Sequence, residues 1–411
     1  MLLLGSKVPD YYAPAVCNNQ LAALAAWLND VTFHHWLDGA REIGFFQILI
    51  GEHGTGKSLI NKPYECIIEP IRKRDEKQRQ KEKEWKEDNN GKAEKEKQPR
   101  GVVQILPHKL TAAKLIDRLE DANKAKKRPL NVKVDEIQLL KEFGGYSNEN
   151  VKTLITIAYD RGLWGAETKS ADGAQGLAPL RINVHASTTP VGANEFFSDK
   201  DTEKGIQRRT ASWPLFRPKD RKIKPKQGDY DQAFKDELMP YLERLAKAKG
   251  NIAVQEANKL CEKIDDELIE MVDAAKAYHW EAYVHTAVMY GWMKACILCI
   301  AEGGWSKKIE HFARWSIYTH LWTNRRFFGR KIESGAKMSR KIQTFVAGPT
   351  MLDLLPTEFT AAEVQQQRVQ QKMTASAKYQ IQNWKRRGLI VKDATTGKYV
   401  KTSRGKREVV K

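Results

Sequence analysis

The stretch FFQILIGEHGTGKSLI, residues 45–60, decides the fold of this chain. Residues 45–50 form an apolar run of strand length, and residues 51–58 follow at once with the pattern GxxxxGKS. Glycines let a backbone curl so that its N–H groups point at phosphate oxygens, and the next helix turns its positive dipole end toward the same anion. A strand before the motif and a helix after it are the context that a phosphate-binding loop needs. The stretch therefore predicts a nucleoside triphosphate site.

The roles of the loop residues follow from their chemistry. Lys57 can reach the β- and γ-phosphates, and the hydroxyl of Ser58 can ligate Mg²⁺. The expected cofactors are therefore ATP and Mg²⁺. The expected nucleotide-binding residues are Gly51, Glu52, His53, Gly54, Thr55, Gly56, Lys57 and Ser58.

Composition narrows the class of partner. The chain of 411 residues carries 70 Lys and Arg against 51 Asp and Glu, a net charge of +19. Clustered cations gain affinity for nucleic acid through counterion release, so a polyanionic partner is favoured over a merely basic protein. The five cysteines are few and scattered, as in a reducing compartment. No apolar stretch reaches membrane-spanning length, so we expect a cytoplasmic protein without a membrane partner.

Four segments are expected along the chain. Residues 1–44 are predicted to be a helical collar, and residues 45–218 an α/β domain. Residues 230–335 are predicted to form a helical bundle, with Trp305, Trp315 and Trp322 in its core rather than on a base-stacking platform. Residues 341–402 show two helical patterns and two short strands, which is the order of a winged helix-turn-helix.

Within the α/β domain, predicted strands alternate with predicted helices. Strands are expected at 101–106, 130–134 and 180–186, and helices at 109–123 and 148–160. This alternation predicts a parallel sheet with phosphate chemistry at the carboxyl ends of its strands. Pro63 and Pro70 are expected to end or kink the helix after the loop. The charged run 72–100 is predicted to be a solvated helix or a disordered insertion, with a turn at 89–91.

An acidic pair ends the predicted strand 130–134. Asp135 can hold Mg²⁺ together with Ser58, and Glu136 can polarise the attacking water as the catalytic base. The alternative is a surface acidic pair that caps a helix starting near Gln138.

Polar residues also end the predicted strand 180–186. Thr188 is the candidate to sense the γ-phosphate or position water, although Ser187 or Thr189 can play that part, and one of the three can instead cap a helix. Arg208 and Arg209 follow in GIQRRT and can reach the γ-phosphate of a neighbouring subunit. A basic pair without such a role is the alternative.

Taken together, the order GxxxxGKS, charged insertion, strand-DE, GLW hairpin, polar strand end and GxxRR…WP resembles the P-loop ATPase domain of primase–helicase proteins from bacterial mobile elements and phages. These are relatives of the virulence-associated E-like and superfamily 3 helicases. The resemblance covers about residues 20–220 and implies an α/β core of the AAA+/ASCE type in a homo-oligomeric, hexameric ring. It also implies ATPase roles for Lys57, Ser58, Asp135, Glu136 and Arg209.

The resemblance further implies contacts with single-stranded or forked DNA. The Gly-rich hairpin in 164–186 occupies the place of the family's DNA-contacting hairpin, with Lys169 near its tip. In the predicted winged helix, residues 374–387 would be the recognition helix. Its cations, with one on the wing, are Lys378, Lys385, Arg386 and Lys398. A winged helix that packs only on protein is the alternative.

Two departures from the family are visible. No primase-like domain precedes the ATPase region, so priming is not expected, and the polar strand end has Ser-Thr-Thr where Asn is common.

The function expected first is an ATP-dependent DNA helicase or DNA-translocating ring ATPase in replication of a mobile element or phage. The alternatives are an ATP-gated DNA-binding initiator or helicase loader without unwinding, and a defence or partner-remodelling ATPase.

Overall fold

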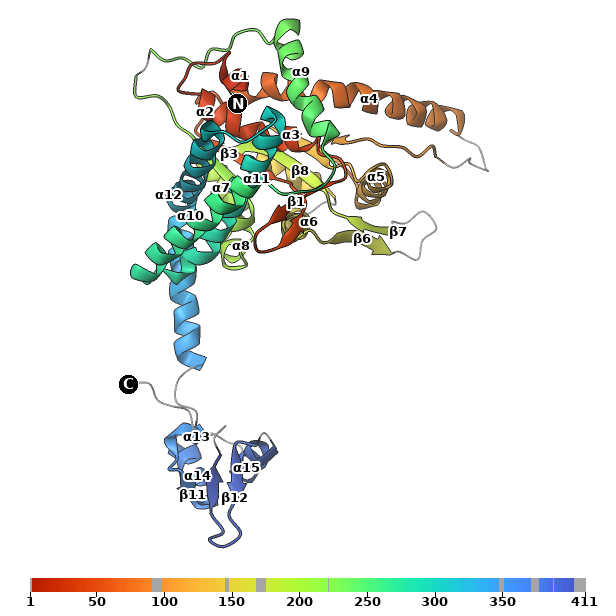
Figure 1. The fold of residues 1–411 in the computed structure, drawn as a ribbon. Coiled ribbons are helices and arrows are strands. Elements are labelled where there is room, and N and C mark those ends of the chain that lie inside the picture. The colour runs from red at the N-terminus through yellow and green to blue at the C-terminus, as the bar shows by residue number, and fades with distance from the viewer. Residues whose placement is uncertain are drawn as a thin grey trace. The chain divides into compact units, whose positions relative to one another are not determined.

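The fold is taken from a computed structural model, which describes residues 2–90, 98–144, 148–167, 175–220, 222–346, 351–370, 377–386 and 388–402. Two compact units are formed, residues 1–335 and residues 336–411 (Figure 1). The predicted collar, α/β domain and helical bundle all lie in the first unit.

A five-stranded, all-parallel sheet lies at the centre of the first unit, in the order β4-β5-β8-β3-β9. The strands are β3 (Phe46–Gly51), β4 (Ile105–Leu106), β5 (Leu130–Val134), β8 (Ile182–Thr188) and β9 (Ala211–Leu215). The predicted α/β class with a parallel sheet is confirmed, although β4 is shorter than the strand expected at 101–106. Since all five strands run the same way, β3, β5 and β8 end at one edge of the sheet.

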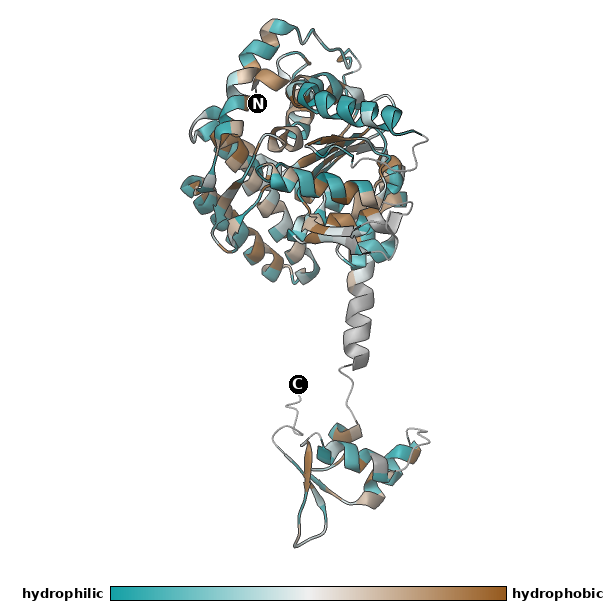
Figure 2. Cartoon of the chain, turned by 90° about the vertical axis from the view of Figure 1, so that its right-hand side faces the viewer, coloured by the Kyte–Doolittle hydropathy of each residue, from teal (hydrophilic) through white to brown (hydrophobic). Residues whose placement is uncertain are grey.

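One face of the sheet is apolar. Alternate residues of β3, β5 and β8 point to it and are buried, namely Ile48, Ile50, Val132, Val134 and Val184. They pack against α5 (Ala112–Lys124), α6 (Asn148–Asp160) and α7 (Pro190–Phe196). Figure 2 shows hydrophobic strands lying among helices that carry both hydrophilic and hydrophobic residues. The period of two in the sequence therefore decides which residues build this core.

The opposite face of the sheet is polar and still buried. Gln47 donates to the carbonyl of Asn18 at 2.6 Å, and the hydroxyl of Tyr64 donates to Asn131 at 2.7 Å. These partners belong to α2 (Ala13–Asn19) and α4 (Asn61–Asp88), which cover this face together with α3 (Leu21–Ala25). Because buried polar groups are usually hydrogen-bonded, these contacts fix α2 and α4 to the sheet.

The expectation that residues 1–44 are entirely helical is wrong. After α1 (Leu2–Gly5), α2 and α3, the strands β1 (Val31–His35) and β2 (Gly39–Arg41) form a small sheet with β10 (Gly250–Ile252). The turn between β1 and β2 contains Leu37, which is 70% exposed. Strand β10 lies more than two hundred residues from β1 in sequence, so no local pattern in residues 1–44 indicates the pairing of β1 with β10.

The two prolines after the loop do not end the helix. Helix α4 runs from Asn61 to Asp88 through Pro70, and Pro63 lies in its first turn, where a missing N–H is tolerated.

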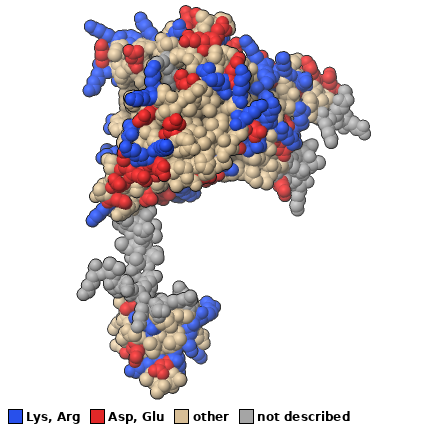
Figure 3. All heavy atoms as spheres, in the orientation of Figure 1, with Lys and Arg blue, Asp and Glu red and all other residues tan. Residues whose placement is uncertain are grey.

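Helix α4 is not exposed to solvent on all sides, although Figure 3 shows basic and acidic side chains interspersed over it. Asp75 accepts the N–H groups of Gln104 and Ile105, both at 2.8 Å.

A buried ion pair reinforces that attachment. Arg118 of α5 donates twice to the carboxylate of Glu82, at 2.5 and 2.7 Å. These contacts attach α4 to the β4 side of the sheet. The chain turns after Asp88 as predicted, and residues 91–97 lie outside the described residues.

The hairpin differs from the prediction in its second strand. Strand β6 (Leu163–Glu167) pairs with β7 (Gln175–Pro179), whereas the strand expected at 180–186 is the separate central strand β8. The hairpin tip, with Lys169, lies outside the described residues.

Four long helices begin in the first unit, and the last of them continues past its boundary at residue 335: α9 (Gln232–Lys247), α10 (Gln255–Ala274), α11 (Glu281–Glu302) and α12 (Lys307–Val346). Within the described residues, one helical segment, Tyr278–Glu302, is long and apolar enough to cross a membrane. Because 83% of its apolar window is buried, it packs as a core helix does. The expected core position of the bundle tryptophans is wrong for Trp315 and Trp322, which are 38% and 48% exposed, while Trp305 is half-buried.

The second unit has its own small core. Its helices are α13 (Met351–Leu354), α14 (Ala361–Gln370) and α15 (Ala377–Arg386), and its strands are β11 (Glu358–Phe359), β12 (Ile390–Lys392) and β13 (Tyr399–Lys401). The strands form an antiparallel sheet in the order β11-β13-β12. Phe359, Ile381 and Trp384 are buried, and the predicted DNA-contacting cations, Lys378, Lys385, Arg386 and Lys398, are exposed.

Candidate functional site

The loop after β3 curls tightly at two glycines. Gly54 and Gly56 have φ values of +71° and +91°, in the left-handed region where a side chain is strained. The chain then makes a 3₁₀ turn, η1 (Lys57–Ile60), before α4 begins. The motif therefore lies between a buried strand and a helical turn, as its spacing predicts.

Lys57 lies across this loop. Its Nζ donates to the carbonyls of Gly51 at 2.7 Å and Glu52 at 3.2 Å. Partial burial lowers the pKa of Lys57, and the nearby carboxylates of Glu136 and Glu52 act in the opposite direction. The loop thus holds a cation next to the acidic pair, and Ser58 is exposed beside it.

Asp135 and Glu136 follow β5 at the same edge of the sheet. Asp135 is 71% exposed and pairs with Lys133 at 2.9 Å. Glu136 precedes the 3₁₀ helix η2 (Ile137–Glu142) but makes no capping hydrogen bond with its side chain. The geometry therefore does not favour the alternative of a helix-capping acidic pair.

The three polar residues that end β8 lie between the loop strand and the acidic strand, and they have different partners. Ser187 donates to the carbonyl of Asp135 at 2.5 Å, and Thr189 caps α7 by accepting the N–H of Gly192 at 3.0 Å. Thr188 is fully buried, and its hydroxyl has no hydrogen-bond partner within the described structure. Among the three hydroxyls, it is thus the one without a hydrogen-bond partner in the described part of the chain.

Arg208 and Arg209 are not next to the loop of their own chain. They form η3 (Gln207–Arg209) ahead of β9, and β9 runs parallel to β3 with Gly51 opposite Leu215. The arginines therefore lie at the edge of the sheet where β3 begins. Arg209 pairs with Asp160 at 3.3 Å, and Arg208 donates to Thr286 at 3.3 Å.

Sequence reasoning missed Arg217. It follows the carboxyl end of β9, and its guanidinium donates to the carbonyl of His53 in the loop at 2.6 Å. The signal was present in the sequence as a cation two residues beyond a strand, but only the pairing of β9 with β3 brings it to the loop.

These residues suit a nucleotide with a divalent ion. Curled backbone, Lys57 and Arg217 supply positive charge for phosphates, and Ser58 and Asp135 supply the oxygen ligands that Mg²⁺ prefers. Within the described ranges, no group of three or more His, Cys, Asp or Glu can hold a metal ion by itself. Phosphate oxygens and water would therefore have to complete the coordination, as is usual for Mg²⁺ in nucleotide sites.

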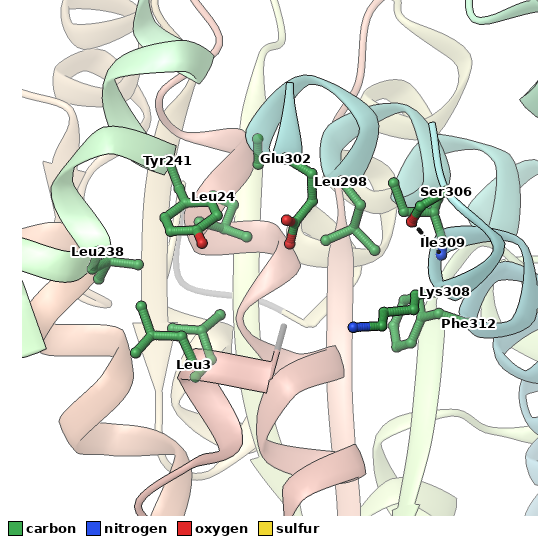
Figure 4. A pocket seen from close by; sticks show the side chains of 12 residues that line it. Leu3, Leu24, Leu238, Tyr241, Leu298, Glu302, Ser306, Lys308, Ile309 and Phe312 are labelled. Carbon is green, nitrogen blue, oxygen red and sulfur yellow. Dashed lines mark hydrogen bonds between the residues drawn. The ribbon is translucent and has the colours of Figure 1, made fainter. Parts of the chain in front are cut away.

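A separate cavity of about 300 Å³ lies among α1, α3, α9, α11 and α12 (Figure 4). It is lined mainly by apolar side chains, including Leu24, Leu238, Leu298 and Phe312. None of the predicted site residues lines it, so the candidate site is the open edge of the sheet around Gly51–Ser58 and not this cavity.

Comparison of the chain with models of known protein families finds no match, and comparison with curated proteins finds none either. The function of the site is therefore inferred from its own geometry and chemistry.

Proposed function

We propose that this chain is a P-loop ATPase of the AAA+/ASCE type that acts on DNA, as a helicase or DNA-translocating ring ATPase in replication of a mobile element or phage. One observation carries the proposal. The loop with Lys57, the acidic pair Asp135–Glu136 and the unpaired Thr188 end three adjacent parallel strands at one edge of the sheet.

Each group has a stated role in this proposal. The loop N–H groups and Lys57 bind the phosphates of ATP. Ser58 and Asp135 hold Mg²⁺, which neutralises charge on the β- and γ-phosphate oxygens when bound. Asp135 would exchange Lys133 for the metal, a small loss because exposed ion pairs contribute little. Glu136 orients and polarises the attacking water, and Thr188 donates a hydrogen bond to water or phosphate.

The DNA part of the proposal is supported by charge. The net charge is +19, and the second unit exposes Lys378, Lys385, Arg386 and Lys398 around α15 and the β12–β13 hairpin, in the element order of a winged helix. We further propose a hexameric ring in the cytoplasm, in which Arg208 and Arg209 serve a neighbouring subunit. Their position away from their own loop supports this role.

The experiment that tests the proposal is ATP hydrolysis by the purified protein, measured with and without single-stranded and forked DNA. We expect both DNAs to raise the turnover. A protein that hydrolyses ATP at one rate regardless of DNA contradicts the DNA part, and a protein that does not bind ATP contradicts the whole.

An initiator that binds DNA without unwinding is the second candidate, because the exposed cations of the second unit belong to a compact unit of their own. Strand displacement on a forked substrate separates the two, since only a helicase yields free single strands.

A further inference from the structure

We propose that an exposed face of α12 binds single-stranded nucleic acid, with bases stacked on its aromatic rings and phosphates paired with its arginines. The α12 face consists of Trp315, Tyr318, Trp322, Arg325, Arg326 and Arg330. This inference rests on the proposed function and specifies where the strand binds in the first unit.

The spacing of these residues places them together. Steps of three and four from Trp315 through Tyr318 and Trp322 to Arg326 follow one side of a helix. The three aromatic side chains are 38%, 41% and 48% exposed. At about 1.5 Å per residue the face extends about 22 Å from Trp315 to Arg330, which is longer than a single nucleotide.

Two of the three rings, Trp315 and Trp322, pack against residues in and after β9. Trp315 lies 4.7 Å from the ring of Trp213, and Trp322 lies 5.6 Å from Phe216. Phe216 also stacks on Phe327 at 6.1 Å. Rings fixed on one side and open on the other present a preorganised platform, so little entropy is lost when a base stacks.

The arginines of the face are available for phosphate. Arg325, Arg326 and Arg330 line a groove of about 650 Å³ together with Trp322 and Asn194. No ion pair or hydrogen bond joins any of the three to another described residue. Lys331 differs, because it donates to the carbonyls of Asn194 at 2.8 Å and Phe197 at 2.6 Å and so fixes α12 to α7.

The combination favours single-stranded nucleic acid. No Asp or Glu lines the groove, so a negatively charged ligand is not repelled by a carboxylate there. Unpaired arginines beside open aromatic rings match a strand whose bases are unstacked and whose phosphates follow one another. Because every base has a π-face, binding here would tolerate any sequence.

The test measures binding of a fluorescent oligothymidylate to the full chain by anisotropy across a salt titration. Trp322→Ala should weaken binding about tenfold, since one base loses its stacking partner, and Trp322→Phe should retain most of the affinity. Arg325→Ala with Arg326→Ala should reduce the steepness of the salt dependence by about 1.4, for two lost phosphate contacts. The control removes two exposed cations elsewhere, Lys249→Ala with Lys259→Ala, and should leave the slope unchanged.

Binding of an ATP analogue by every variant shows that the fold is intact. If Trp322→Ala and the double variant Arg325→Ala with Arg326→Ala both bind the oligonucleotide as well as the wild type does, the inference is wrong while the proposed function stands. If the wild type binds ATP but no oligonucleotide, the DNA part of the proposed function fails and this inference fails with it. A change of oligomeric state in the α12 variants alone, with unchanged affinity, would make the face a contact between copies and overturn the inference.

Discussion

The guanidinium of Arg217 donates a hydrogen bond of 2.6 Å to the main-chain carbonyl of His53 in the loop. Its neighbour Phe216 contacts the rings of Trp322 and Phe327 on α12. Two consecutive residues after β9 therefore touch the candidate phosphate site and the α12 face. A displacement of α12 can therefore be transmitted to the loop through Phe216 and Arg217.

Arg217 is expected to support nucleotide binding. Arg217→Ala removes a cation from the loop, and hydrogen bonds from charged groups are worth about 1.5–3 kcal/mol, so the KM for ATP should rise about tenfold or more. Steady-state ATPase assays measure this. Lys219→Ala is the matched control, since it removes an exposed cation two residues away. An unchanged KM in Arg217→Ala would limit Arg217 to shaping the loop.

Lys57 and Glu136 should fail in different ways. Lys57→Ala leaves phosphate charge uncompensated and should abolish ATP binding, with Lys62→Ala on α4 as the control. Glu136→Gln should bind ATP but turn it over about a hundredfold more slowly or worse, because the water loses its base. Calorimetry and phosphate release separate the two effects. Substantial turnover by Glu136→Gln would remove the acidic pair from the chemistry.

Arg209 is expected to act between subunits. In mixtures, Arg209→Ala protein should depress wild-type turnover by more than its share of the total protein, since each mutant subunit spoils a neighbouring site. Because Arg209 pairs with Asp160, Asp160→Asn is the informative control. If Asp160→Asn depresses turnover in the same way, Arg209 has a structural role. The same holds if turnover in the Arg209→Ala mixtures falls only in proportion to the share of mutant protein.

The buried Lys294 should make stability depend on pH. Its Nζ donates to Ser316 at 2.9 Å and lies 5.1 Å from the ring centre of Trp213, and burial lowers the pKa of Lys294 to about 7. Between pH 7 and its ordinary pKa the unfolded chain binds the proton and the folded chain does not. Stability from this group should therefore rise with pH by up to about 1.4 kcal/mol per unit in that window, and not change below it.

Urea unfolding between pH 7 and 9.5 measures this slope. Lys294→Met keeps the side-chain length and removes the titration, so its stability should be higher near neutrality and should lack that rise. Equal slopes in the two proteins would mean that Lys294 keeps its proton in the fold.

The second unit is expected to contribute duplex binding. Deleting residues 350–411 should lower affinity for duplex DNA at low salt, because phosphate contacts are salt-dependent, and should spare ATP binding. Lys378→Ala with Lys385→Ala tests the same idea without truncation, by removing two exposed cations of α15. Equal duplex affinity across a salt titration would make this unit a protein-interaction module.

Much of the candidate site was predictable because its signals are local. The loop, the strand before Asp135 and the strand that ends in Thr188 each depend on a few consecutive residues whose backbone preferences agree with the fold. The choice among Ser187, Thr188 and Thr189 was not predictable, since it depends on Asp135 and α7 having already taken two of the three hydroxyls as partners.

By itself, the sequence determined the α/β class and placed the loop and the acidic pair at the ends of strands. Only tertiary structure decided that β8 lies between β3 and β5, that β1 pairs with β10, and that Arg217 rather than Arg209 reaches the loop of its own chain. It also decided that Trp322 is exposed and not buried. The physical reason is distance along the chain: backbone preference and periodicity act over a few residues, whereas strand order and burial depend on which distant segments become neighbours.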